Sequence, residues 1–188
     1  MHNLKFLEVS DEKTLKKVFA FRYKILSEIY PKYIQELQLK DALEFDKYDK
    51  YALHFVALDY NNNVRATVRL IYHSPIGYPT ENSMVFDREL FDRDKLGELS
   101  RIFVDAKYRN IQNTRVIIEE VKKFMYYKMR EFGIEYSYGS LEKNFLRLLK
   151  IYKMFYHPIG EMQKHGLFGE RYPCILYTDE LGDNLNEA

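Results

Sequence analysis

A glutamate and an arginine lie within an apolar run that has the composition of a β-strand, Glu98 to Val104. Burying a charge in a strand costs several kcal/mol unless the charge is paired, so Glu98 and Arg101 together favour a functional site. A positioned carboxylate such as Glu98 can take a proton from a reacting group. The plainer alternative is a structural ion pair. At a spacing of three, the two side chains point to opposite faces of a regular strand, and a bulge near Ser100 would bring them to one face.

The composition limits what such a site could belong to. The 188 residues include 29 basic and 28 acidic side chains, so the net charge is +1 and electrostatics do not favour nucleic-acid binding. Cys174 is a single cysteine and the five histidines show no metal-ligand spacing, so we expect neither a disulfide nor a metal. No run of 18 apolar residues and no export signal is visible, which predicts a cytoplasmic protein without a membrane span. The length favours one domain over residues 1–180, with 181–188 as a disordered tail.

The first elements must provide partners for these charges. Leu4 to Val9 reads as a strand, and Ser10 is placed to cap a helix that ends near Pro31. Arg22 falls on the apolar face of this helix, so we expect it to meet a buried carboxylate. A second helical segment runs from about Lys32 to Leu39, and the loop after it carries Glu44, Asp46 and Asp49. Such a loop can be merely solvated, but with Arg22 in need of a partner we expect Asp46 and Asp49 to supply the carboxylate.

A hairpin follows the acidic loop. The strand Tyr51 to Asp59 turns at Asn61-Asn62-Asn63, where asparagine tolerates positive φ, and returns as Val64 to Tyr72. Arg69 alternates with the apolar residues of the second strand and therefore points away from them. His73 to Ser83 reads as a loop because of its prolines and glycine, and Met84 to Phe91 as a helical turn that presents Phe86.

The second half reads as alternating helices and strands. We expect a helix capped by Asn113 or Thr114 with Val116 on its buried face, ending at Gly133; the remaining expected elements are a strand at 134–139, a helix at 141–155 and strands at 159–162 and 172–178. The strands at 98–104 and 134–139 are joined by a helix and should be parallel. This order predicts an α/β (α+β) fold, a mixed and largely antiparallel sheet of about six or seven strands flanked by helices.

The ordered motifs resemble those of a known family. The strand, loop and helix around Arg109-Asn110-Ile111-Gln112-Asn113-Thr114 resemble the GNAT acyltransferase superfamily, with Gln112 and Thr114 where its phosphate loop has glycines. A narrower resemblance is to the acyl-homoserine-lactone synthases and the related N-acyl amino acid synthases, and it rests on Arg22, Asp46, Asp49, Arg69-Leu70, Phe86 and Glu98-Leu99-Ser100-Arg101. The chain has no tryptophan, which the lactone synthases carry after the first helix, and its proline-containing loop is more similar to the N-acyl amino acid branch.

The resemblance implies a single-domain GNAT-like fold and an enzyme that moves an acyl group from an acyl carrier protein or acyl-CoA to a small-molecule amine, for which an amino acid is the first candidate. Glu98 would be the base, and Tyr152 would protonate the departing thiolate. The further roles that the resemblance implies are an ion network of Arg22, Asp46, Asp49, Arg69 and Arg101; thioester and phosphopantetheine binding by Ile102, Phe103, Val104, Arg109, Asn110, Gln112, Asn113 and Thr114; and an acyl pocket with Phe86 and Ser100.

Three other functions remain open at this point: a lactone signal synthase that uses S-adenosylmethionine, an ordinary acetyl-CoA-dependent acetyltransferase, and a module that senses acyl thioesters without catalysis. Basic residues on the two later helices are typical of solvated faces but could also bind an acidic carrier protein. They are Lys122, Lys123, Lys128, Arg130, Lys143, Arg147, Lys150 and Lys153.

Overall fold

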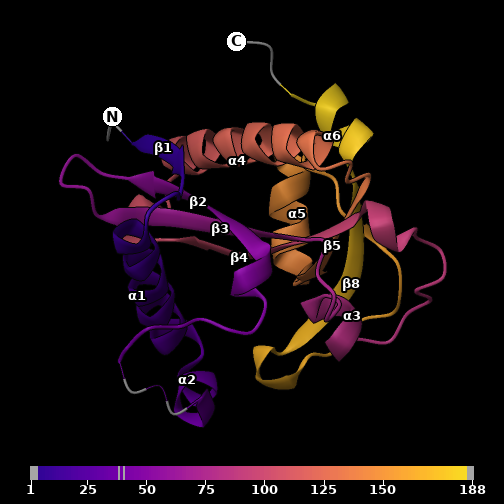
Figure 1. Cartoon of the computed structure of the whole chain (residues 1–188), viewed down its shortest axis with the longest axis horizontal. Helices are drawn as coiled ribbons and strands as arrows, with labels where there is room; N and C mark the ends of the chain where they lie inside the picture. The colour runs from indigo at the N-terminus through magenta and orange to yellow at the C-terminus, as the bar shows by residue number, and fades with distance from the viewer. Residues whose placement is uncertain (1–3, 38, 40, 186–188) are drawn as a thin grey trace.

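The computed structural model describes residues 4–37, 39 and 41–185, and its centre is one twisted sheet of eight described strands (Figure 1). The strand order is β1-β2-β3-β4-β5-β8-β6, and β7 pairs with β8 outside this path. The strands are β1 (Lys5–Glu8), β2 (Ala52–Leu58), β3 (Val64–Tyr72), β4 (Leu96–Val104), β5 (Tyr136–Leu141), β6 (His157–Pro158), β7 (Gln163–Lys164) and β8 (Glu170–Tyr177). The predicted mixed, largely antiparallel sheet is confirmed.

Strand directions follow the connections. The hairpin of β2 and β3 is antiparallel, as its asparagine turn predicts, and Asn62 has the expected positive φ of 58°. Strands β4 and β5 are parallel, and they are the one parallel pair among the described strands. Their pairing covers only Leu96 to Glu98 on β4, so the second half of this strand has no ladder partner in β5.

Helices cover both faces of the sheet, with α4 on one side and α1 on the other (Figure 1). On the α4 side, Ala66, Val68 and Leu70 of β3 pack with residues of α4 such as Ile117 and Met125. The α-helices are α1 (Glu12–Ile29), α2 (Pro31–Leu37), α3 (Pro79–Ser83), α4 (Ile111–Glu131), α5 (Lys143–Ile151) and α6 (Thr178–Asp183). Short 3₁₀ turns lie at Asp49–Tyr51, Arg93–Lys95, Ala106–Tyr108 and Gly166–Phe168.

Both predicted helix caps are off by a few residues. The side chain of Asp11, not Ser10, accepts the Thr14 N–H at 2.8 Å and caps α1. Helix α4 is capped by Asn110, which accepts the N–H of Asn113 at 3.0 Å, so Asn113 lies inside the helix. Several polar residues at each start could serve as a cap, and the direction in which the chain enters the helix selects one of them.

Three other expectations are wrong in position. The helical turn forms as α3 at Pro79–Ser83, inside the segment read as a loop, and not over 84–91. Val116 is 49% exposed and does not join the buried face of α4. The tail expected to be disordered from residue 181 begins inside α6, where Leu181 is buried against the main core, and residues 186–188 lie outside the described residues. Leu181 and the hydrogen bond from the Thr178 hydroxyl to the Ile134 carbonyl attach α6 to the rest of the domain.

Strand β4 is distorted where the sequence required it. Arg101 has a φ of 54°, in the left-handed region, and the register of β3 with β4 shifts between Thr67 and Arg69, opposite this point. Ser100 pairs with Arg69, and Arg101 falls into the irregularity. The predicted distortion near Ser100 is therefore confirmed, and it turns Arg101 to the face of the sheet that carries Arg69 and Ser100.

Candidate active site

Glu98 is enclosed in the middle of the sheet, on β4 opposite Ile71 of β3. It is 2% exposed, and its two carboxylate oxygens accept hydrogen bonds from the Thr80 backbone N–H at 2.8 Å and from the Thr80 hydroxyl at 2.9 Å. Burial raises the pKa of Glu98 from 4.5 to about 7, although the Thr80 hydrogen bonds and the charge of Arg69 pull it down. Glu98 is thus a buried carboxyl group that can gain and lose a proton near neutral pH.

Arg22 does meet a buried carboxylate, as the sequence predicts. Its Nε lies 2.5 Å from Glu44 and its Nη1 lies 2.7 Å from Asp49, and Arg22 and Glu44 are both fully buried. Arg101 binds the other oxygen of Glu44 at 2.6 Å and reaches Asp46 at 3.1 Å. Burial would raise the pKa of Glu44, but the charges of Arg101 and Arg22 outweigh it and lower the pKa to about 2. Glu44 therefore stays ionised and joins α1 to the bulge of β4.

Arg69 completes the cluster from β3. Its Nη1 lies 2.7 Å from Asp46 and 3.0 Å from Asp49, and its Nε donates to the Ser100 hydroxyl at 3.0 Å. The cluster thus joins three guanidinium groups to three carboxylates and is electrically balanced. All five residues predicted for the network meet here. The sixth member, Glu44, was visible only as a third acid in the same loop, and the need to balance three buried arginines could have identified it.

His54 lies beside this network without a strong bond to it. Its Nε2 is 3.5 Å from Asp49, and its ring packs edge-on against Phe19. Burial lowers the pKa of His54 to about 4, and the charge of Asp49 offsets only part of this effect. His54 is therefore neutral at pH 7.

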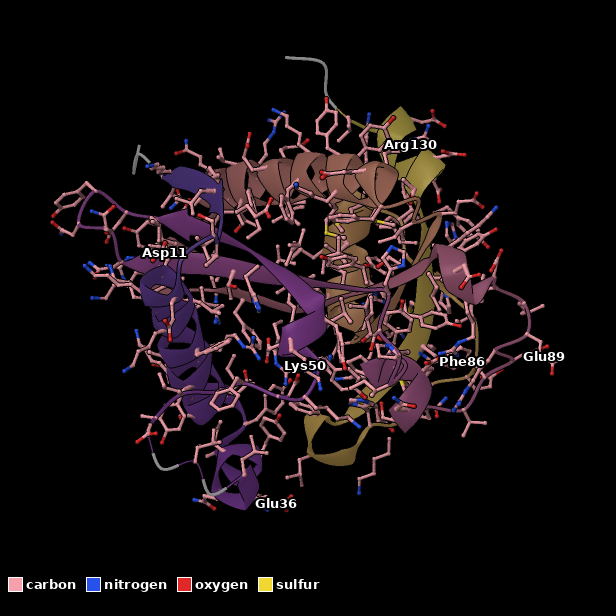
Figure 2. All side chains as sticks on the ribbon, viewed as in Figure 1. Asp11, Glu36, Lys50, Phe86, Glu89 and Arg130 are labelled. Carbon is pink, nitrogen blue, oxygen red and sulfur yellow. The ribbon has the colours of Figure 1, made fainter. Side chains whose placement is uncertain are left out.

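Ser100 and Phe86, the two residues expected in an acyl pocket, lie in different surroundings. Ser100 belongs to the ion network through Arg69. Phe86 packs edge-to-face on Tyr138 with ring centroids 5.2 Å apart, on the side of the molecule away from α1 (Figure 2). Tyr138 also meets Phe91 at 5.8 Å, so Phe86 is part of an aromatic cluster next to α3. Their assignment to an acyl pocket stays a prediction.

The residues predicted to bind the thioester follow the bulge. Phe103 and Val104 pair with β3 on one side. On the side that faces β5, neither these two residues nor Ile102 has a ladder partner. The backbone at this parting of two parallel strands can pair with an extended ligand. Arg109 donates to the Val104 carbonyl at 2.9 Å, which ties the loop before α4 to the end of β4.

The start of α4 offers polar groups for a phosphate. Gln112 is exposed at the first turn, and Thr114 is half-buried. Asn110 is occupied as the helix cap, and the side-chain Nδ2 of Asn113 is buried without a partner among the described residues. Backbone N–H groups at a helix start favour anions, and glycines are absent from this one.

Two tyrosines lie near the end of α5. Tyr152 ends the helix half-buried, and its carbonyl accepts a hydrogen bond from Lys122 at 3.0 Å. Tyr156 is buried against Gly139 of β5, so closely that a Cβ at Gly139 would lie 2.9 Å from its ring. Burial raises the pKa of the Tyr156 hydroxyl. The charge of Glu98 also raises this pKa, whereas the hydrogen bond to Ser137 lowers it. Tyr156 is thus a second candidate acid that the sequence interpretation passed over.

The predicted basic surface is only partly available. Lys122 is fully buried, bonded to Glu119 at 3.0 Å and to the Tyr152 carbonyl, so it cannot contact a partner protein. Four basic side chains, three on α5 and one just after its end, are exposed and make no ion pair with a described residue. They are Lys143, Arg147, Lys150 and Lys153.

Two parallel strands that separate, a helix that starts beyond them and a buried carboxyl group beside the gap are the features of an acyltransferase of GNAT architecture. The family described as the acetyltransferase (GNAT) domain matches residues 21–119, just over half of the chain, and the chain belongs to this family. Membership confirms the expectation of an N-acyltransferase. A search of the curated proteins found no match.

Solved structures confirm the narrower resemblance in fold. The acyl-homoserine lactone (AHL) synthase LasI superposes with a TM-score of 0.76 at 14% identity, covering 98% of this chain and 95% of its own. A CoA-dependent acyl-homoserine lactone synthase, BjaI, solved with S-adenosylmethionine (SAM) and isopentyl-CoA, gives 0.69 at 18% identity, with 97% and 90% covered. FeeM, an N-acyl amino acid synthase from uncultured soil microbes, gives 0.67 at 13% identity, with 98% and 95% covered.

Two further features bear on the expectations from sequence. Among the residues that the structure describes, no three His, Cys, Asp or Glu side chains are grouped so that they could hold a metal ion. None of the described helices is long and apolar enough to cross a membrane.

Proposed function

We propose that the protein transfers an acyl group from a phosphopantetheine thioester to the amine of a small molecule, with an amino acid as the first candidate acceptor. The observation that supports this most is Glu98, a buried carboxyl with a pKa of about 7 at the point where β4 and β5 separate. A base works best when its pKa is close to the working pH. We place the enzyme in the cytoplasm, where a lone thiol such as Cys174 stays reduced.

The chemistry follows from these positions. The acceptor amine attacks the thioester carbonyl carbon, a carbon–nitrogen bond forms, and Glu98 takes the proton that the nitrogen loses. Backbone N–H groups between Ile102 and Val104 bind the pantetheine arm and polarise the carbonyl. The carbon–sulfur bond then breaks, and Tyr152, or Tyr156 beside it, donates a proton to the departing thiolate. The ion network of Arg22, Asp46, Asp49, Arg69 and Arg101, with Glu44 between Arg22 and Arg101, holds the bulge that orients this site.

Two thioesters compete as the acyl donor. BjaI is a CoA-dependent synthase, which supports an acyl-CoA held by Arg109, Asn110 and the first turn of α4. An acyl carrier protein is the alternative, since the exposed basic face of α5 suits an acidic partner. In both cases the reacting group is the same thioester, so the role of Glu98 does not depend on which donor is used.

The test is product formation by the wild-type protein and by Glu98→Gln. Both are incubated with acyl-CoA or acyl carrier of several chain lengths and a set of amino acids, and the products are identified by mass spectrometry. We expect an N-acyl amino acid from the wild type and a loss of roughly 10²- to 10⁴-fold in Glu98→Gln, with circular dichroism and thioester binding unchanged. Glu135→Gln, at a half-exposed surface ion pair, is the control and should keep full activity. Full activity in Glu98→Gln would refute the assignment of the base.

A second candidate function is supported by the likeness to LasI and BjaI. In that case S-adenosylmethionine supplies the amine and the product is an acyl-homoserine lactone. Release of methylthioadenosine in the same assay identifies this reaction, and its absence alongside an N-acyl amino acid excludes it. Use of acetyl-CoA with no response to longer chains would instead indicate an ordinary acetyltransferase. Thioester binding without any product would indicate a sensing module.

A further inference from the structure

Thr80 donates a hydrogen bond to each of the two carboxylate oxygens of Glu98. Its backbone N–H donates to Oε2 at 2.8 Å and its hydroxyl to Oε1 at 2.9 Å, and Thr80 is itself fully buried. The residue belongs to α3, in the segment between β3 and β4 that carries no chemistry in the reaction described above. One residue from outside the sheet, through its backbone and its side chain, therefore sets the orientation of the proposed base.

The segment that carries Thr80 is held in place from several sides. The Tyr78 N–H donates to Glu81 at 2.9 Å, and Glu81 is bound by both terminal nitrogens of Arg93 at 3.0 and 3.1 Å. The Tyr78 hydroxyl donates to the Leu96 carbonyl, two residues before Glu98. Gly77 has a φ of 75°, and a Cβ there would collide with the Glu81 carboxylate. These contacts fix α3 against the strand that presents Glu98.

The backbone N–H and the hydroxyl of Thr80 differ in which protonation state of Glu98 they can bind. A backbone N–H can only donate, so it favours the ionised carboxylate at Oε2. A hydroxyl can donate or accept, so after Glu98 takes a proton on Oε1 the acid can donate that proton to the Thr80 oxygen, and the hydrogen bond is kept with its direction reversed. Thr80 thus supports both protonation states of a group that must alternate between them.

We propose that Thr80 is the positioning residue of Glu98, and that its hydroxyl and backbone N–H, by holding one carboxylate oxygen each, favour the ionised form of this buried group. The proposal rests on the role of Glu98 in the proposed function. Loss of the hydroxyl costs the ionised form more than the protonated form, because a hydrogen bond to a carboxylate is charge-assisted and stronger than one from a neutral acid, so Glu98 should bind its proton more tightly. The other charged or titratable groups that act on Glu98 do not change; they are Arg69 on β3, Tyr78 and Glu81 at α3, Tyr138 on β5 and Tyr156 after α5.

The experiment compares Thr80→Val with Thr80→Ser. Valine keeps the shape and the backbone N–H, so the acid limb of the pH dependence of kcat/KM should move up by about one to two pH units, with the activity restored at high pH. Serine keeps the hydroxyl and should leave the limb in place. Thr67→Val is the matched control, because Thr67 is also buried but its hydroxyl has no partner among the described residues. It should leave the limb unchanged.

A second readout does not depend on turnover. The Glu98 carboxyl carbon is followed by NMR in protein labelled with ¹³C-glutamate, assigned by its absence in Glu98→Gln. Its titration should move up in Thr80→Val and stay in place in Thr80→Ser. If no variant shows acyl transfer, the proposed function fails while this titration still decides the role of Thr80. An unchanged titration in Thr80→Val, or in Thr80→Ala should the valine variant not fold, overturns the proposal.

Discussion

Replacing Glu44 by glutamine removes the negative charge between two buried guanidinium groups. Glu44 is fully buried and lies 2.5 Å from Arg22 and 2.6 Å from Arg101. The amide keeps the shape of the side chain but cannot accept from both arginines as a carboxylate does. Removing one partner of a buried ion pair leaves the other charge without compensation, which costs about 3–5 kcal/mol.

The pKa of Glu44 supports a similar magnitude. A carboxyl whose pKa falls from 4.5 to about 2 on folding contributes about 3 kcal/mol to the free energy of unfolding at pH 7. This contribution is fully present above pH 4.5, the unfolded value, and it is lost as the pH falls towards the folded value of about 2. Glu44→Gln lacks this contribution at every pH, because its amide does not ionise. The difference between the two proteins should therefore be about 3 kcal/mol at pH 7 and should shrink steadily below pH 4.5.

Urea unfolding followed by circular dichroism at pH 7, 5 and 3.5 measures this difference, and thermal unfolding at pH 7 should show a fall of about 6–12 °C. Glu120→Gln is a matched control, because Glu120 is 34% exposed in a pair with Lys123 on α4, and it should change stability by less than about 0.5 kcal/mol. A loss under about 1 kcal/mol at pH 7 in Glu44→Gln, or a difference that does not shrink in acid, would show that the network does not hold Glu44 ionised.

Two further predictions concern neighbouring features. The pKa of His54 is about 4 in the folded protein against an ordinary value of 6.5, so the unfolded chain binds the extra proton and stability falls as the pH drops from 6.5 towards 4. Between pH 7 and 5 the free energy of unfolding should fall by about 2 kcal/mol more in the wild type than in His54→Asn, as measured by urea unfolding. An equal fall in both proteins would contradict this prediction. On α5, reversing Arg147 and Lys150 to glutamate should lower kcat/KM at least tenfold with an acyl carrier donor and leave kcat/KM with acyl-CoA unchanged. Reversal of Lys13 and Lys16, on α1, is the control, and equal effects on both donors would rule out a carrier surface on α5.

Local patterns predicted the hairpin well. The boundaries of β3, Val64 to Tyr72, are those expected from alternating side chains and an asparagine turn, because both signals act within a few residues. Helix α3 was missed for the opposite reason. Five residues cannot form a stable helix alone, and this one depends on Glu98 and Arg93, which reach Thr80 and Glu81 of the helix from elsewhere in the chain.

The ion network shows the same division. Arg22 on an apolar helix face requires a buried carboxylate, and this requirement can be seen in the sequence. Asp46 and Asp49 were expected in the network and are found there, but the part of Glu44 could not be seen, because the three acids share one loop and only its folded path brings Glu44 to Arg22 and Arg101. The bulge at Arg101 could be predicted from the sequence, because the side chains of Glu98 and Arg101 point to opposite faces of a regular strand and reach one face only if the strand is distorted between them.

The sequence by itself determined the mixed sheet, the parallel β4–β5 pair and the presence of an unusual carboxylate and arginine in β4, because periodicity, turns and charge placement are local properties. Only the tertiary structure decided what Glu98 is: a carboxyl with a pKa of about 7, held by Thr80 and near Arg69 and Tyr156. Burial and hydrogen bonding depend on residues far apart in the chain. The protonation of this group therefore becomes readable only after the chain has folded around it.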